Sequence, residues 1–201
     1  NRCRRQRQMC IRDRIIEIDL DDEVLGVGMP CGGKMEVYVE PFLPQPELML
    51  VGQGRIAELV AELGRLLHFR VTVNSPGATR EDFPFADQLI TDDTDYQKIN
   101  PGLNSYVIVL TQHKGDQQVI QAALRGTPRY IGLVASAKRS RLVVEYLKEG
   151  GMDADALRQV LRAPCGLDLG GRTPEEIALS IITEVVKLRH ERTGLSMMEV
   201  K

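Results

Sequence analysis

A glycine turn between an apolar strand and an amphipathic helix constrains this chain more than any other feature of its sequence. The apolar run 48–51 is followed by Gly52, Gly54 and Ala57, at the G-x-G-x-x-A spacing of a dinucleotide-binding turn. The first glycine permits a tight bend, the second lets a phosphate approach the backbone, and the third position permits close helix–strand packing. The helix N-terminus then offers free N–H groups and a partial positive charge to an anion. The alternative is a tight strand–helix turn that binds no ligand.

The second strand of this pattern ends on an unusual residue for a nucleotide site. Residues 70–73 form the expected strand, and Asp or Glu normally follows such a strand and hydrogen-bonds the ribose. Here the position is Asn74, an uncharged amide. Because charge-assisted hydrogen bonds are about twice as strong as neutral ones, we expect weak NAD binding or a different ligand. Arg80, farther along the loop, is either a solvated arginine or a contact for a 2′-phosphate.

Composition excludes several classes of protein. With 43% hydrophobic and 27% charged residues, the 201-residue chain is typical of an ordinary globular domain. The net charge of −2 gives no electrostatic argument for nucleic acid or a membrane surface. No apolar run approaches the roughly twenty residues needed to span a bilayer, and no signal peptide is recognised. The four cysteines contain no C-x-x-C pair, so we expect free thiols in a reducing cytoplasm and no structural zinc site.

After a proline-rich linker, short apolar strands alternate with helices. We expect strands over 48–51, 70–73, 88–90, 106–110 and 130–134, and helices over 55–69, 116–126, 136–150, 154–162 and 174–192. The last helix starts at a capping box, Thr173-Pro-Glu-Glu176. This alternation predicts an α/β fold, a doubly wound parallel sheet with helices on both faces.

The chain divides into four predicted segments. Residues 1–14 are rich in arginine and form a disordered or non-native tail, with a basic arm for nucleic acid as the alternative. Residues 15–46 hold an extended apolar stretch, an alternating strand over 35–40 and the proline-rich linker. Residues 47–194 form the α/β domain, and residues 195–201 form a C-terminal tail.

Four further positions are candidates for chemistry. Cys31 lies between Pro30 and the pair Gly32-Gly33, where an uncrowded thiol could be reactive or bind a metal, although free cysteines are commonly small buried hydrophobes. His113 and Ser136 follow the strands 106–110 and 130–134, at the strand ends where open α/β sheets bind ligands. Asp168 could bind a hydroxyl or cap a turn. For each of them a solvated loop or a structural role is the alternative.

Together these motifs resemble the XdhC/CoxF-type accessory proteins that mature molybdenum hydroxylases such as xanthine and carbon monoxide dehydrogenases. The matching pieces are the Gly-Met-Pro-Cys-Gly-Gly segment around Cys31, the glycine turn, Thr-Gln-His at 111–113, the segment 130–136, and Ala163-Pro-Cys-Gly-Leu-Asp-Leu-Gly-Gly with the Thr-Pro-Glu-Glu-Ile-Ala that follows. The resemblance implies a Rossmann-like domain preceded by a truncated N-terminal extension, because the Ser-Gly-Gly-Cys element common in the family's N-terminal domain does not occur here.

The resemblance also implies a function. It implies binding of the molybdenum cofactor, molybdopterin or its dinucleotide form, and delivery of that cofactor to a hydroxylase subunit, without turnover by this chain. Cys31 matches the family cysteine expected at the cofactor and its metal, and His113 and Asp168 match positions on the ligand-facing edge. Cys165 stands where the resemblance leads us to expect an aliphatic residue. For the oligomeric state, a homodimer is an open alternative to a monomer. The alternative functions are an NAD(P)-dependent oxidoreductase, which Asn74 disfavours, and a partner-binding module with a vestigial nucleotide fold.

Overall fold

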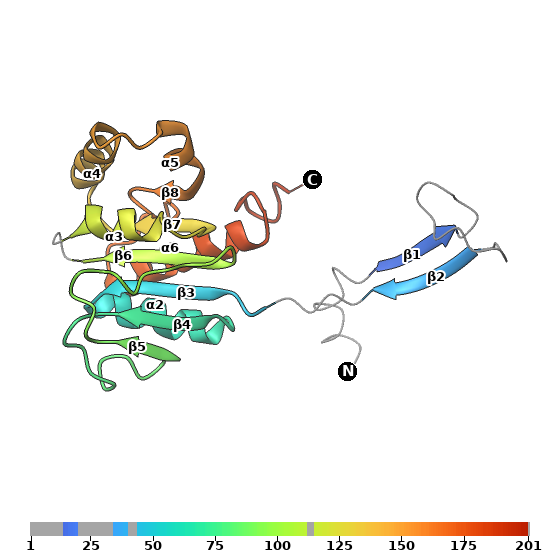
Figure 1. Cartoon of the computed structure of the whole chain (residues 1–201), viewed down its shortest axis with the longest axis horizontal. Coiled ribbons are helices and arrows are strands. Elements are labelled where there is room, and N and C mark those ends of the chain that lie inside the picture. The colour runs from blue at the N-terminus through green and yellow to red at the C-terminus, as the bar shows by residue number, and fades with distance from the viewer. Residues whose placement is uncertain (1–13, 20–33, 40–43, 112–114, 201) are drawn as a thin grey trace. The chain divides into compact units, whose positions relative to one another are not determined.

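The computed structural model describes residues 14–19, 34–39, 44–111 and 115–200 (Figure 1). The chain divides into two compact units, residues 1–44 and residues 45–201. In the first unit, β1 (Arg14–Asp19) pairs with β2 (Lys34–Val39) in an antiparallel hairpin, with Arg14 opposite Val39. The alternating strand predicted over 35–40 is therefore confirmed, shifted by one residue.

The second unit is built on one sheet of six parallel strands, in the order β5-β4-β3-β6-β7-β8. The strands are β3 (Glu47–Gly52), β4 (Arg70–Asn74), β5 (Gln88–Ile90), β6 (Ser105–Leu110), β7 (Tyr130–Leu133) and β8 (Leu161–Arg162). From β3 the chain builds outward to β4 and β5, then returns to β6 on the other side of β3 and builds outward again. This strand order is that of the doubly wound dinucleotide-binding fold, and it reverses between β3 and β6.

Five helices are present in this part of the structure: α2 (Arg55–Leu66), α3 (Asp116–Ala123), α4 (Ala137–Glu149), α5 (Ala154–Val160) and α6 (Pro174–Arg189). Each predicted helix is confirmed, with ends that differ by a few residues. Helix α2 stops before Phe69 because His68 adopts a left-handed backbone conformation, with φ of +61°. No helix among the described residues has the length and apolar character needed to cross a bilayer.

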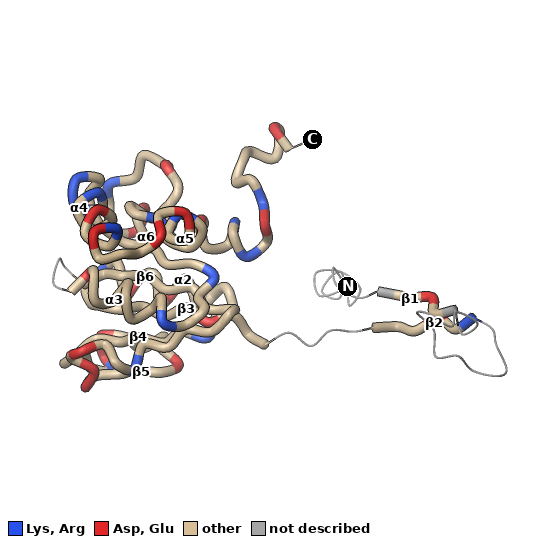
Figure 2. The backbone as a smooth tube through the Cα atoms, turned by 45° about the horizontal axis from the view of Figure 1, so that its top comes forward, with Lys and Arg blue, Asp and Glu red and all other residues tan. Residues whose placement is uncertain are grey.

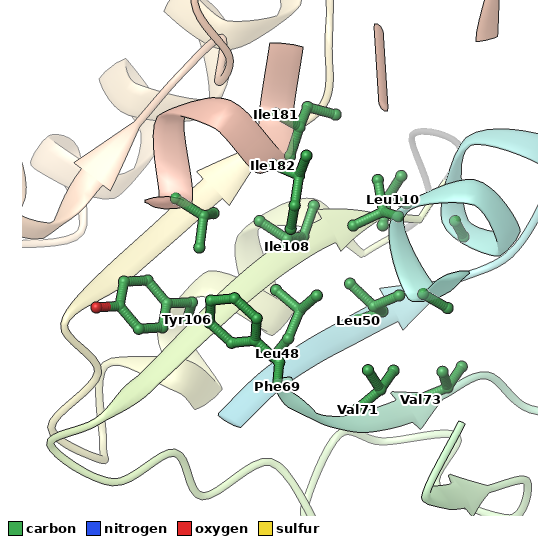
Figure 3. Close-up of a cluster of buried hydrophobic side chains, with 14 of the residues drawn as sticks. Leu48, Leu50, Phe69, Val71, Val73, Tyr106, Ile108, Leu110, Ile181 and Ile182 are labelled. Carbon is green, nitrogen blue, oxygen red and sulfur yellow. The ribbon is translucent and has the colours of Figure 1, made fainter. Parts of the chain in front are cut away.

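One face of the sheet packs against α2 and α6. Leu48 and Leu50 of β3 contribute to this core together with Ile181 and Ile182 of α6, and all four are buried (Figure 3). The Phe69 and Tyr106 rings meet edge to face, with 5.8 Å between their centroids.

The other face of the sheet packs against α3, α4 and α5. Met49 and Val51, which alternate with the leucines along β3, belong to this second core. Strand β3 is therefore buried on both faces, as its continuous apolar sequence predicts. Along the helices of this unit, basic and acidic residues are interspersed (Figure 2).

The capping box that opens α6 is confirmed. The Glu176 N–H donates to Thr173 Oγ1 at 3.3 Å, and the Thr173 N–H donates to Glu176 Oε2 at 3.0 Å. A second donor, the Arg172 N–H, also reaches Glu176 Oε2, at 2.8 Å. These backbone donors hold the pKa of the Glu176 carboxyl below its usual value.

We predict that Thr173→Ala lowers the free energy of unfolding by about 1 kcal/mol, because the substitution leaves the Glu176 N–H without its cap. The matched control is Thr183→Ala on the same helix, where the hydroxyl only donates to the Leu179 carbonyl. Removing that bond is expected to be neutral or slightly stabilising, since alanine favours a helix interior. Urea unfolding of both variants measures the difference, and equal effects would contradict the role of the cap.

Candidate functional site

A cleft opens where the strand order reverses. It has a volume of about 240 Å³ and lies at the carboxyl ends of β3, β4 and β6. Its lining residues are Gly52, Gln53, Asn74, Ser75, Pro76, Tyr96, Leu110 and Thr111. Open α/β sheets bind their ligands at this position, so the cleft is the candidate ligand site.

Position 52, at the floor of the cleft, must be glycine because the neighbouring strand β6 lies too close for a side chain. The φ of Gly52 is +126°, and a Cβ built on it would lie 2.1 Å from the Leu110 carbonyl oxygen of β6. The tight bend predicted from the sequence is therefore confirmed. The close neighbour that excludes a side chain here is the backbone of β6.

The N-terminus of α2 faces the same edge of the sheet without a side-chain cap. Gly54 is the N-cap residue, with φ of +103°, and its carbonyl accepts the first helical hydrogen bond, from the Glu58 N–H at 3.1 Å. The three N–H groups before Glu58 precede the helical hydrogen-bond ladder, and together with the helix dipole they favour an anion. Ala57, in the first turn of α2, is completely buried, as close helix–strand packing predicts.

Asn74 ends β4 at the cleft and is completely buried. Its Nδ2 donates to Asp93 Oδ2 at 2.5 Å. Asp93 is itself buried, and its other oxygen accepts from the Gln97 N–H at 2.8 Å. Asp93 was not among the residues predicted from the sequence, because it lies 19 positions after Asn74 in a loop without a recognisable motif.

A second buried carboxylate stands at the β6 side of the cleft. Asp116 begins α3 and is 2% exposed. It accepts hydrogen bonds from the Thr111 hydroxyl and from Arg139 Nε, the latter at 3.0 Å. Ser136 caps α4 by accepting from the Arg139 N–H at 3.3 Å. The structure thus gives Ser136 a local capping contact. It also places Arg139 against the Asp116 carboxylate, near the carboxyl end of β6.

Tyr96 is the aromatic residue in the lining of the cleft, and no sequence pattern pointed to it. Its φ of +60° is uncommon for a residue with a side chain. A Cβ built on Gly115 would lie 2.7 Å from the Tyr96 hydroxyl, so the ring extends to the start of α3. Burial, and then the nearby Asp116 and Asp93 carboxylates, raise the pKa of the Tyr96 phenol.

Cys165 is partly buried away from this lining. Desolvation and the nearby Glu184 carboxylate raise the pKa of its thiol to about 12. Glu184 accepts from the Tyr130 hydroxyl at 2.5 Å and from the Gly166 N–H at 2.8 Å. At neutral pH Cys165 is therefore a protonated thiol beside a structural hydrogen-bond network, which disfavours a reactive role for this sulfur.

Asp168 is exposed in the loop that joins β8 to α6. The Leu167 carbonyl at the preceding position accepts from the Ser180 hydroxyl at 2.5 Å, which fixes this loop on α6. The N-terminus of α6 approaches that of α2, because Arg55 Nε lies 3.7 Å from Glu175 Oε1.

Cys31, Gly32, Gly33 and His113 lie outside the described residues, so the roles predicted for them stay predictions. Among the residues that are described, no group of three or more His, Cys, Asp or Glu side chains is placed to hold a metal ion. Of the predicted site residues, the structure brings Gly52 and Asn74 together in one cleft, with Gly54 and Ala57 in the adjoining turn.

Comparison with known proteins agrees with this geometry. Residues 48–185 match the family of XdhC Rossmann domains. The chain is 29% identical over 163 residues to a probable xanthine dehydrogenase subunit of Bacillus subtilis, covering 76% of this chain and 46% of that protein. It is 27% identical over 181 residues to the uncharacterized protein YqeB of Escherichia coli, covering 86% of this chain and 33% of that protein.

A solved structure shares the fold. The crystal structure of a xanthine dehydrogenase from Bacillus halodurans superimposes with a TM-score of 0.64 at 24% identity, over 85% of this chain and 50% of that one. The chain thus spans no more than about half the length of these relatives.

We predict that Gly52→Ala destabilises the protein by more than about 3 kcal/mol, because the new methyl group overlaps the Leu110 carbonyl and the backbone is strained as well. The matched control is Gly151→Ala, where φ is +86° and no atom lies within 4 Å of the added Cβ. That variant carries backbone strain alone, about 1 kcal/mol. Thermal and urea unfolding measure both variants, and a Gly52→Ala variant as stable as Gly151→Ala would refute the close approach of β3 and β6.

Proposed function

Because the chain belongs to the XdhC family, we propose that it is an accessory protein that binds the molybdenum cofactor and assists its insertion into a molybdenum hydroxylase. One observation carries the proposal: the cleft at the β3–β6 switch point adjoins the uncapped N-terminus of α2. That combination suits a phosphate-bearing ligand.

The donors beside this cleft would suit a dinucleotide form of the cofactor. The N–H groups that open α2, at Arg55, Ile56 and Ala57, would hold the phosphates. Asn74 and Ser75 line the cleft beside β4, on the side where the nucleotide's sugar would lie. The chain's contribution is to bind and orient its cargo, while the molybdenum centre does its redox chemistry in the hydroxylase that receives it.

The metal-bearing end of the cargo is assigned to the Cys31 segment. In the proposal, Cys31 contacts the metal or its dithiolene, and the two residues that follow it in the sequence, Gly32 and Gly33, bring no side chain that would compete for the site. His113, Ser136 and Asp168 are proposed for the ligand-facing edge, with Ser136 acting from its place at the start of α4.

The partner is proposed from the relatives. The Bacillus subtilis protein that is similar to this chain over 163 residues is named as a probable xanthine dehydrogenase subunit, which supports a hydroxylase of that type as the recipient. The match covers 46% of that relative, so the surface that binds the hydroxylase can include segments outside the matched region.

An NAD(P)-dependent oxidoreductase is less well supported. Asn74 replaces the carboxylate that usually binds the ribose, and a neutral amide oxygen accepts a hydrogen bond more weakly than a carboxylate does. Titration with NADH and NADPH distinguishes the two functions, since the oxidoreductase requires micromolar affinity for one of them.

We predict that the chain, purified from cells that synthesise the molybdenum cofactor, carries a bound pterin, and that Cys31→Ala loses most of it while remaining folded. Mass spectrometry of the released small molecules and fluorescence of the oxidised pterin measure the content. Circular dichroism checks the fold.

Cys10→Ala is the matched control, because it removes a thiol from the predicted N-terminal tail and should leave the pterin content unchanged. Equal pterin in the Cys31→Ala variant and the parent would remove Cys31 from the mechanism. A hydroxylase subunit that copurifies with every variant while no pterin is found would instead favour a partner-binding module.

A further inference from the structure

One acceptor atom in the lining of the cleft has no hydrogen-bond partner among the described residues. Asn74 is completely buried and lines the cleft, and its Oδ1 makes no hydrogen bond to any described residue. Buried polar atoms are nearly always hydrogen-bonded, and an exception calls for a partner such as a ligand. A hydrogen-bond donor bound in the cleft would remove the cost of this unpaired oxygen.

Asp93 fixes which way the Asn74 amide points. Its Oδ2 accepts from Asn74 Nδ2 at 2.5 Å and from the Lys98 N–H at 3.1 Å, and its Oδ1 accepts from the Gln97 N–H at 2.8 Å. Because a carboxylate in these contacts can only accept, the amide must turn its NH₂ group toward Asp93. The oxygen of the amide is then the atom left for a ligand, and it can only accept.

The same carboxylate holds the wall of the cleft. Asp93 accepts hydrogen bonds from the N–H groups of Gln97 and Lys98. These two residues directly follow Tyr96, which lines the cleft and has a strained backbone conformation. Asp93 therefore joins the sugar side of the cleft to its aromatic wall.

On the basis of the proposed function, we propose that Asn74 and Asp93 form a ribose-recognition pair that accepts a free 2′-hydroxyl and rejects a 2′-phosphate. Asn74 occupies the position of the usual ribose carboxylate, and here the carboxylate stands behind the amide, in Asp93. A ribose hydroxyl can donate to Asn74 Oδ1. A 2′-phosphate offers acceptor oxygens to an acceptor and brings negative charge toward Asp93.

The pair also explains why an amide stands at position 74. An aspartate there would place two carboxylates in contact across the 2.5 Å that now separates Asn74 Nδ2 from Asp93 Oδ2. Two carboxylates at such a distance cannot both ionise without a large cost. An amide at position 74 instead donates its NH₂ group to the Asp93 carboxylate, and its oxygen remains as the acceptor for a ligand.

The test compares nucleoside 5′-diphosphates that differ only at C2′, by calorimetry on the whole chain. The probes are CDP with 2′-deoxy-CDP, and ADP with 2′-deoxy-ADP and 2′-phospho-ADP. We expect each deoxy form to bind about 10-fold more weakly than its ribose form. We expect 2′-phospho-ADP to bind more weakly than 2′-deoxy-ADP.

Asn74→Leu should weaken the ribose forms to the level of the deoxy forms, so that the ratio falls to about 1. Lys148→Met, which alters a residue of the groove between α4 and α5 and not of the cleft, should leave the ratio unchanged. If Asn74→Leu does not fold, the ratio measured on the parent chain still decides.

Equal binding of ribose and deoxy forms, or tighter binding of 2′-phospho-ADP through a residue such as Arg80, would overturn the recognition pair and leave the proposed function standing. Failure of every diphosphate to bind at millimolar concentration would overturn the phosphate site itself, and with it both proposals.

Discussion

The close approach of two strand ends determines the architecture of the site. At Gly52 the backbone of β3 comes so near the Leu110 carbonyl of β6 that a side chain is excluded. This contact is made where the strand order reverses, so the loops leaving β3 and β6 run to opposite faces of the sheet and leave a cleft between them. The turn after Gly52 then directs the N-terminus of α2 toward that cleft, with its amide groups uncapped.

Two buried carboxylates stabilise the borders of the cleft. On the β4 side, Asp93 holds the Asn74 amide and the backbone after Tyr96. On the β6 side, Asp116 holds the Thr111 hydroxyl and the Arg139 side chain. Because buried charged groups are costly unless they are fully hydrogen-bonded, each carboxylate commits several surrounding segments to one arrangement. The residues on both borders of the cleft are thereby held in place by contacts within the chain.

Local sequence patterns predicted the fold well and the site only in part. Periodicity, the glycine spacing and the Thr173 capping box located the helices and nearly all the strands, because those signals are short-range. The two-residue strand β8 was missed, since Leu161 and Arg162 carry no pattern that separates them from the preceding helix. Asp93 and Tyr96 were missed because their roles depend on contacts with Asn74 and Gly115, which lie far from them in the sequence. The unpaired oxygen of Asn74 is likewise visible only in three dimensions.

Our central proposal is that a nucleotide's phosphates bind at the α2 N-terminus beside Asn74. The most direct measurement is the change in backbone amide NMR shifts when CDP is added to the isotopically labelled chain. We expect the largest changes to fall on Gly54 to Ala57 and on Asn74 and Ser75. Shifts confined to the groove between α4 and α5, which Leu157 and Lys148 help to line, or no shifts at all, would contradict it.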